Sequence, residues 1–205
     1  MKHFHLILAS SSKYRQEMLK RLGLPFTAIS PDIDETRHQQ ESPQDLALRL
    51  SYEKACAIAQ THPDAIVIGS DQVACLGDEV LGKPGNFETA FQQLKAQSNQ
   101  TLYFHTALTV IHGWHVAEHQ PRIVYRENVP TICAYRELSD DEITHYLHTE
   151  KPFDTAGSAK AESLGISLMQ YMRSDDPTAI IGLPLIALSR MLRDCGLNPT
   201  LLASK

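Results

Sequence analysis

The sequence has only four cysteines among its 205 residues, and no two of them form a C-x-x-C pair. Zinc sites and disulfide frameworks both depend on cysteines at characteristic spacings, so neither is predicted here. Scattered cysteines of this kind are typical of a reducing compartment. We therefore expect reduced and mostly buried thiols at Cys56, Cys75, Cys133 and Cys195.

The chain also lacks an excess of basic residues and any long apolar run. Its 19 Lys and Arg residues are outnumbered by 24 Asp and Glu residues, which gives a net charge of -5 at pH 7. Proteins that wrap nucleic acid or lie on anionic membranes present a basic face. No apolar stretch approaches the ~20 residues of a membrane span, and the first residues lead too quickly into a polar segment to form a signal peptide. We expect a cytoplasmic protein with no nucleic-acid and no membrane partner.

Two common nucleotide-binding motifs are missing as well. The sequence contains neither G-x-x-x-x-G-K-[ST] nor G-x-G-x-x-G, so a P-loop and a dinucleotide-binding fold are not predicted. Its 42% hydrophobic and 21% charged residues are ordinary for a globular protein. Short β-rich runs alternate with helical patterns, which favours an α/β fold. We predict one domain over residues 1–205, built as two lobes.

The first informative stretch has the order strand, serine loop and helix. Apolar residues over 6–8 suit a short buried strand, and Met18 and Leu19 begin a helical face that ends near Gly23. A helix entered through Ser12 presents free N–H groups, where a phosphate binds readily. Arg15 falls in the first turn, where a cation is unfavourable unless an anion lies nearby. The alternative is an ordinary serine cap with a solvated arginine.

Acidic and basic side chains follow in the next segments. Asp32, Asp34 and Glu35 form an acidic turn after a short strand, and such oxygens suit Mg²⁺. A solvated turn is the alternative. A helix is predicted from Ser42 through about residue 60, with Lys54 on its apolar face. A lysine there is commonly a surface residue with a buried stem.

A β-branched run over residues 66–68 predicts a central strand, and Gly69, Ser70, Asp71 and Gln72 follow at its end. Ligands of open α/β sheets collect beyond the carboxyl ends of strands, so Asp71 is a candidate for chemistry. Lys83 then stands between a glycine and a proline.

The later part of the chain gives structural signals. Helices are predicted over residues 87–97 and 139–148 and toward Cys195, and a hairpin is predicted to turn at His112 and Gly113. Two glycines and other small residues surround a carboxylate in the stretch 154–166, which is typical of tight loops or of close approach to a ligand.

Taken together, these segments resemble the Maf-like family of nucleoside triphosphate pyrophosphatases. The matching segments cover most of the chain in family order: LILASSSKYRQEMLKRLGL, PDIDE, RLSYEKA, IVIGSDQV, GKP, DTAGSAKAESLGI and IIGLPLIAL. The resemblance implies a two-lobed α/β fold with a long curved mixed sheet flanked by helices, similar to inosine triphosphate pyrophosphatases. It also implies a divalent cation (Mg²⁺, Mn²⁺ or Co²⁺) and a possible homodimer.

The resemblance assigns roles to individual positions. Asp71 is implied as the proton acceptor, and with Glu35 as a metal ligand. The residues implied around the triphosphate and metal are Ser10, Arg15, Glu35, Lys54 and Lys83, to which our reading of the loop adds Ser12. The positions implied in substrate choice are Tyr14, Gln72 and Glu162. The chain departs from the family loop Ser-Pro-x-Arg-Arg, because Lys13 replaces the proline and Gln16 the second arginine.

The reaction implied is attack of water on the α-phosphorus, which releases pyrophosphate. Residues Tyr14, Gln72 and Glu162 resemble the branch that acts on 7-methyl-GTP, and we expect Tyr14 to stack on the cationic base and Glu162 to accept its hydrogen bonds. Gln72 is expected to contact either the base or a phosphate. The alternatives are a broader pyrophosphatase for damaged purine nucleotides, and a nucleotide-binding regulator, for instance of cell division, with incidental hydrolysis.

Overall fold

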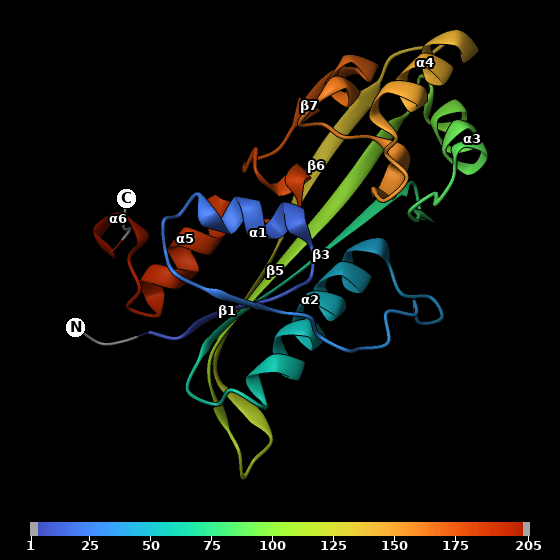
Figure 1. Ribbon diagram of the computed structural model, residues 1–205. Coiled ribbons are helices and arrows are strands. Elements are labelled where there is room, and N and C mark those ends of the chain that lie inside the picture. The colour runs from blue at the N-terminus through green and yellow to red at the C-terminus, as the bar shows by residue number, and fades with distance from the viewer. Residues whose placement is uncertain (1–3, 203–205) are drawn as a thin grey trace.

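One seven-stranded mixed sheet runs the length of the molecule and carries all the other elements (Figure 1). The computed structural model describes residues 4–202. The strand order is β2-β1-β3-β5-β6-β7, with β4 paired to β3; β1 is parallel to β2 and β3, and all other pairs are antiparallel. The strands are β1 (Leu6–Ala9), β2 (Thr27–Ile29), β3 (Ile66–Leu76), β4 (Glu79–Leu81), β5 (Thr101–His115), β6 (Gln120–Tyr135) and β7 (Met169–Arg173).

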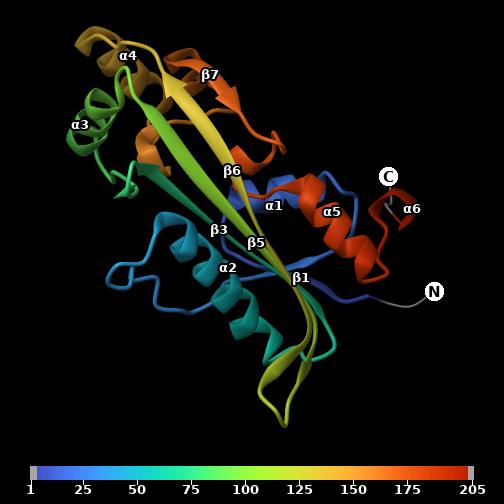
Figure 2. The same cartoon turned by 180° about the vertical axis from the view of Figure 1, so that it is seen from behind.

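The helices divide the molecule into two lobes along this sheet (Figures 1 and 2). In one lobe, α1 and α5 cover one face of the sheet and α2 the other; α3, α4 and β7 belong to the second lobe. The helices are α1 (Lys13–Lys20), α2 (Pro43–Ala59), α3 (Phe87–Gln97), α4 (Asp140–Glu150), α5 (Leu185–Asp194) and α6 (Pro199–Leu202), with short 3-10 helices η1 (Ala156–Ser158), η2 (Leu164–Leu168) and η3 (Ala179–Ile181). The predicted two-lobed α/β fold is confirmed. None of the helices in this described part of the chain is long and apolar enough to cross a membrane.

Serine side chains start three of the predicted helices. The hydroxyl of Ser12 accepts from the backbone N–H of Arg15, and that of Ser42 accepts from Asp45. Ser139 forms a full capping box with Glu142 at the start of α4. Each cap satisfies backbone donors that the helix itself leaves unpaired, so the predicted helix starts are confirmed.

The predicted turn at His112 and Gly113 is wrong. Strand β5 continues to His115 and pairs with β6 in one unbroken register, with His112 opposite Ile123 and Trp114 opposite Pro121. Gly113 adopts a positive φ of 78°, and the backbone N–H groups of Gly113 and Trp114 both donate to carbonyls at the end of the α2–β3 connection. The glycine therefore allows a local distortion within the strand rather than a chain reversal.

The predicted end of β3 near Gly69 also differs from the structure. Strand β3 continues to Leu76, so Asp71 lies inside the strand. However, β1 pairs with β3 only as far as Ile68, and β4 joins the same side of β3 only from Ala74. Among the described strands, residues 69–73 of β3 therefore have a partner on one side only, and Asp71 lies at this gap in the sheet, beyond the carboxyl end of β1.

Helix α2 packs directly on the backbone of β3 at Gly69. A Cβ atom added at Gly69 would lie 2.1 Å from the carbonyl oxygen of Ser51 and 2.9 Å from the Cβ of Ala55. Because one contact is with helix backbone, side-chain rotation cannot relieve it. The absent side chain at Gly69 therefore sets the spacing between α2 and the strand that carries Asp71.

We predict that Gly69→Ala lowers the free energy of unfolding by about 1–3 kcal/mol or more, since α2 must move away from β3. Gly82→Ala is the matched control, because an added Cβ there meets nothing within 4 Å. Its change is expected within about 0.5 kcal/mol. Urea denaturation followed by circular dichroism measures both. Equal midpoints for Gly69→Ala and the unsubstituted chain would contradict the packing argument.

Candidate active site

A buried lysine and a buried aspartate meet at the gap in the sheet. Lys54 on α2 is 6% exposed and Asp71 on β3 is 7% exposed. The Lys54 Nζ atom lies 2.5 Å from Asp71 Oδ1 and 2.8 Å from Glu35 Oε1. Charges this well buried persist only when paired, so Lys54 is not a solvated surface residue. The structure brings three of the predicted site residues together here.

Glu35 reaches this lysine from the loop after β2, and its side chain is 61% exposed. Burial alone would raise the pKa of the Glu35 carboxyl. The hydrogen bond from Lys54 and the charges of Lys54, Lys83 and Arg15 act the other way, and the pKa lies below its ordinary value. Glu35 is therefore an ionised carboxylate within the influence of three predicted site cations.

Arg15 joins the cluster from the start of α1. Its Nε atom donates to the carbonyl of Gly182 at 3.0 Å, and Nη1 lies 3.5 Å from Ser10 Oγ. Burial lowers the pKa of the guanidinium, and the charges of Asp71 and Glu35 oppose this effect. These carboxylates supply the nearby negative charge that a cation in the first turn of a helix requires.

The cluster as a whole has a surplus of positive charge. It contains three cations (Arg15, Lys54 and Lys83) and two carboxylates (Glu35 and Asp71), a formal balance of +1 within a chain of net charge -5. Lys83 is exposed, on the loop that follows β4. A cluster with this balance is suited to a polyanion such as a triphosphate.

The serine loop has a structural part in the site. The backbone N–H of Ser12 donates to the buried Ser10 hydroxyl at 3.1 Å, and Ser12 caps α1. Both hydroxyls thus hold the loop in its present shape, at the helix start where phosphate binding by Ser10 and Ser12 is predicted.

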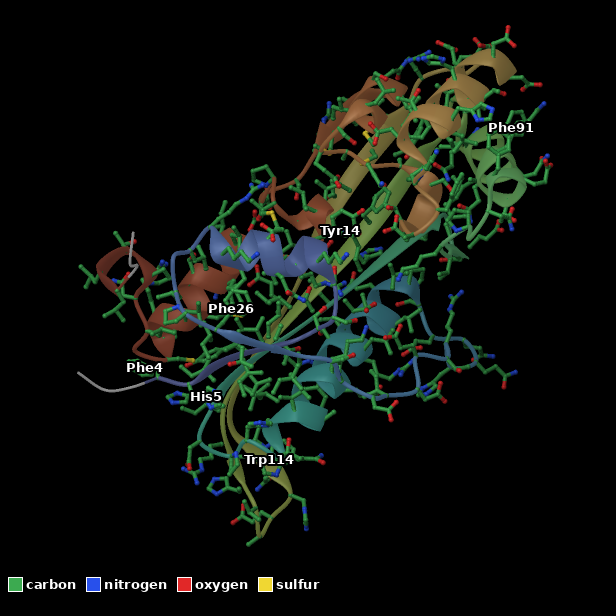
Figure 3. All side chains as sticks on the ribbon, in the orientation of Figure 1. Phe4, His5, Tyr14, Phe26, Phe91 and Trp114 are labelled. Carbon is green, nitrogen blue, oxygen red and sulfur yellow. The ribbon has the colours of Figure 1, made fainter. Side chains whose placement is uncertain are left out.

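The three positions predicted to choose the substrate, Tyr14, Gln72 and Glu162, come from three different elements. Tyr14 lies at the start of α1, near the junction of the lobes (Figure 3), and its hydroxyl is 3.5 Å from Asp154 Oδ2 in the second lobe. Glu162 is exposed beyond η1, and its charge acts on Tyr146. The structure therefore brings Asp154 of the second lobe to the tyrosine. Asp154 was not singled out from sequence, although the glycine-rich stretch begins with it.

Gln72 points toward the other face of β3. Its Nε2 atom lies 3.0 Å from Thr106 Oγ1 and from the carbonyl oxygens of Ala179 and Ile180. Ser70 has a similar orientation, with its hydroxyl 3.0 Å from the Gly182 carbonyl. Ser70 and Gly182 were not predicted as site residues. They are 112 residues apart in the sequence, so no local pattern indicates their contact.

Two carboxylates at this site suit a divalent cation whose remaining ligands come from the substrate and water. Mg²⁺ prefers oxygen ligands and commonly takes one or two from protein, with waters and phosphate oxygens filling the rest. Asp71 and Glu35 supply such oxygens on either side of Lys54. Within residues 4–202 no three His, Cys, Asp or Glu side chains gather closely enough to hold a metal by themselves.

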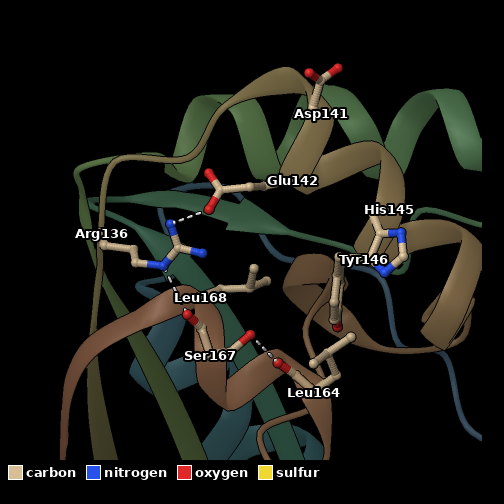
Figure 4. Close-up of a pocket in the computed structure, with 8 residues that line it drawn as sticks. All are labelled: Arg136, Asp141, Glu142, His145, Tyr146, Leu164, Ser167 and Leu168. Carbon is tan, nitrogen blue, oxygen red and sulfur yellow. Dashed lines mark hydrogen bonds and ion pairs between the residues drawn. The ribbon is translucent and has the colours of Figure 1, made fainter.

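A separate hollow lies in the second lobe, between α4 and η2 (Figure 4). Its volume is about 340 Å³, and it contains none of the predicted site residues. Arg136 on its wall pairs with Glu142 at 2.7 Å and donates to the carbonyl of Ser167 at 2.9 Å. Arg136 and Glu142 already satisfy each other, and the hollow has no cluster of cations like that at the sheet gap, so we place the active site at the gap.

The curved mixed sheet, with a cationic cluster at the gap between β1 and β4, defines an α/β protein whose charge at this gap suits an anionic ligand. Comparison with protein-family models matches residues 5–195 to "Maf-like protein". The chain belongs to the Maf-like family, so the resemblance drawn from its motifs is confirmed.

Curated relatives agree with this assignment, and one solved structure shares the fold. The chain is 58% identical over 194 residues to a 7-methyl-GTP pyrophosphatase of Bordetella pertussis, covering 95% of this chain and 94% of the relative. It is 52% identical over 197 residues to one of Aromatoleum aromaticum, covering 96% and 98%. A HAM1 protein from Coxiella burnetii has a TM-score of 0.51 and 17% identity, covering 94% of this chain and 100% of that chain. This structural likeness confirms the fold.

The loop that carries Glu35 is held by a partly buried ion pair. Arg49 on α2 contacts Glu41 through two nitrogens, at 2.6 and 2.9 Å, and donates to the Thr36 carbonyl at 2.9 Å. Hydrogen bonding from Arg49 lowers the pKa of Glu41 to about 2, against the opposing effect of burial. This pair ties the loop to the helix that carries Lys54.

We predict that Glu41→Gln lowers the free energy of unfolding at pH 7 by on the order of 2 kcal/mol, by removing charge-assisted hydrogen bonds. The stabilisation by Glu41 is fully present above its unfolded pKa near ~4.3 and is lost as the pH falls toward 2. Urea denaturation between pH 7 and pH 2 should therefore show a smaller acid-induced loss in Glu41→Gln. Glu17→Gln removes only the exposed pair with Lys20 and is the control. Parallel pH curves for both variants would refute the assignment.

Proposed function

We propose that this protein is a nucleoside triphosphate pyrophosphatase that hydrolyses 7-methyl-GTP to the nucleoside monophosphate and pyrophosphate. The observation that carries this proposal is the position of one buried carboxylate, Asp71, among the cations Arg15, Lys54 and Lys83. Binding of a triphosphate needs cations alone, whereas a carboxylate beside them supplies a proton acceptor. The names of the curated relatives support the choice of nucleotide.

In the proposed reaction a water molecule attacks the α-phosphorus and the bond from that phosphorus to the bridging oxygen breaks. Asp71 orients the water and accepts its proton, while pyrophosphate leaves. Lys54 holds one oxygen of Asp71 at 2.5 Å, which fixes the carboxylate and leaves its second oxygen for the water. Arg15 and Lys83 neutralise phosphate charge, which is the main demand of phosphoryl transfer.

Glu35 and Asp71 are the residues that would hold a divalent cation. Such an ion, when bound, supplies further charge neutralisation and orients the phosphates. Ser10 and Ser12 would present the N-terminus of α1 to a phosphate. The positive balance of the cluster favours an anionic ligand whether or not the cation is present.

For the base, we propose that Tyr14 stacks on the cationic 7-methylguanine ring and that Glu162 accepts hydrogen bonds from it. A cation over an aromatic face is attracted to the ring, and a carboxylate suits the N–H donors of guanine. The half-buried position of Tyr14, facing Asp154 across the lobes, supports the stacking part of this proposal. The homodimer and the cytoplasmic location stay predictions.

We predict that Asp71→Asn lowers kcat for 7-methyl-GTP at least about 100-fold, since a general base contributes 10²–10⁴-fold. The variant should fold, because an asparagine oxygen still accepts from Lys54. Pyrophosphate release with Mg²⁺, Mn²⁺ or Co²⁺ and with no added metal measures activity across a nucleotide panel, and thermal melting checks folding. Asp140→Asn, in an exposed pair with Lys95, is the control and should be unaffected. Turnover near that of the unsubstituted enzyme in Asp71→Asn would overturn the catalytic assignment, and binding without turnover across the panel would favour a regulator.

We predict that Glu162→Gln reduces the ratio of kcat/KM for 7-methyl-GTP over UTP by about 10-fold or more, because the neutral amide is a weaker acceptor for the guanine donors. Glu137→Gln, an exposed glutamate elsewhere in the second lobe, is the control. Asp154→Asn is measured beside it. If the ratio falls in Asp154→Asn and stays unchanged in Glu162→Gln, base recognition belongs to Asp154 instead.

A further inference from the structure

The segment 179–182, made of η3 and Gly182, connects Arg15 to strand β3; we call it the Gly182 loop. The Gly182 carbonyl accepts a hydrogen bond from Arg15 Nε at 3.0 Å. The Ser70 hydroxyl lies 3.0 Å from the same carbonyl and 2.9 Å from the Ala107 carbonyl, so its single proton is shared between these two acceptors. Gly182 itself has φ 108° and ψ 5°, a conformation that favours glycine. This carbonyl therefore holds the Nε–H edge of the Arg15 guanidinium, while Nη1 lies 3.5 Å from Ser10 Oγ.

Gln72 holds the same loop two residues further along β3. Its side-chain N–H groups face the carbonyl oxygens of Ala179 and Ile180 and the hydroxyl of Thr106, each at 3.0 Å. Thr106 donates to the Ala179 carbonyl at 3.0 Å and is fully buried on β5. The amide nitrogen of Gln72 is thus already engaged by protein groups, which leaves it unsuited to donate to a base or a phosphate.

The alternation of side chains along β3 explains this arrangement. Ser70 and Gln72 lie on one face of the strand and contact the Gly182 loop, while Asp71 between them faces Lys54 on α2. Strand β3 therefore carries the proposed proton acceptor, Asp71, on one face. On its other face, Ser70 and Gln72 contact the loop that holds Arg15.

The Gly182 loop is also anchored at its other end. Asp176 is 2% exposed, and its carboxylate accepts from Thr178 and from the backbone N–H of Ile186 at the start of α5. Because both ends are hydrogen-bonded, the loop acts as a fixed support rather than as a free connection.

We propose that Ser70, Gln72 and Thr106 are positioning residues that orient the Arg15 guanidinium through the Gly182 loop, and that Gln72 influences the reaction by this route instead of touching the nucleotide. This inference rests on the proposed function for its effect on turnover, and on the hydrogen bonds alone for its effect on Arg15. Arg15 Nε donates to the loop, which leaves both terminal nitrogens for the phosphates.

Thr106 gives the sharpest test, because a fully buried side chain cannot contact a substrate. Thr106→Val has nearly the same shape and removes the hydroxyl, while Thr106→Ser keeps it. Ser70→Ala removes the direct bond to Gly182 and provides a second variant if Thr106→Val fails to fold. Thermal melting establishes which variants are folded.

The first readout needs no nucleotide. Hydrogen exchange of the Arg15 Nε proton is followed by nitrogen-15 NMR, with Arg15→Lys used to assign the signal. We expect Ser70→Ala and Thr106→Val to speed exchange at least 10-fold, and Thr106→Ser to remain within 2-fold of the unsubstituted chain. Unchanged exchange in folded Ser70→Ala and Thr106→Val would overturn the proposal.

The second readout is a double-mutant cycle on kcat/KM for 7-methyl-GTP. We expect Ser70→Ala and Thr106→Val each to lose at least 10-fold, and to lose nothing further when Arg15 is already Ala. Losses that multiply with Arg15→Ala would show that these residues act elsewhere and would overturn the proposal. If exchange responds as expected but the chain hydrolyses no nucleotide, the proposed function fails while the positioning of Arg15 stands.

Discussion

The ion pair between Lys54 and Asp71 is the interaction on which the rest of the structure depends. Both charges are nearly buried, so each needs the other, and removing one partner of such a pair leaves an uncompensated charge. The pair joins α2 to β3 and therefore requires close packing between them. Gly69, two residues before Asp71, allows that approach because a Cβ atom there would overlap the helix backbone.

The carboxylates around this pair compensate two cations, Arg15 and Lys54, whose positions would each be unfavourable alone. A cation at the start of α1 opposes the helix dipole, and a lysine on an apolar helix face opposes burial. Arg15 is compensated by Asp71 and Glu35, and Lys54 by the same two carboxylates. The remaining positive charge is left for the ligand, so local costs in the free protein are relieved further when an anion binds.

Several parts of this picture could be predicted from sequence and others could not. Helix starts at serine caps, the α/β class and the charged residues of the site all follow from local patterns and from motif order. The roles of Ser70 and Gln72 depend on carbonyls more than a hundred residues later in the chain, which no local pattern encodes. The turn at Gly113 was misplaced because a glycine with positive φ occurs in distorted strands as well as in turns.

The sheet that joins the two lobes has a mechanical consequence. Strands β3, β5 and β6 pass from one lobe into the other without interruption, and the buried residues of each contribute to the hydrophobic cores of both. A rigid-body separation of the lobes would strain these ladders of hydrogen bonds, so the continuous sheet resists it. The loops and side chains on both lobes are therefore mounted on one continuous support, so a shift of either lobe is transmitted along the same three strands to the other.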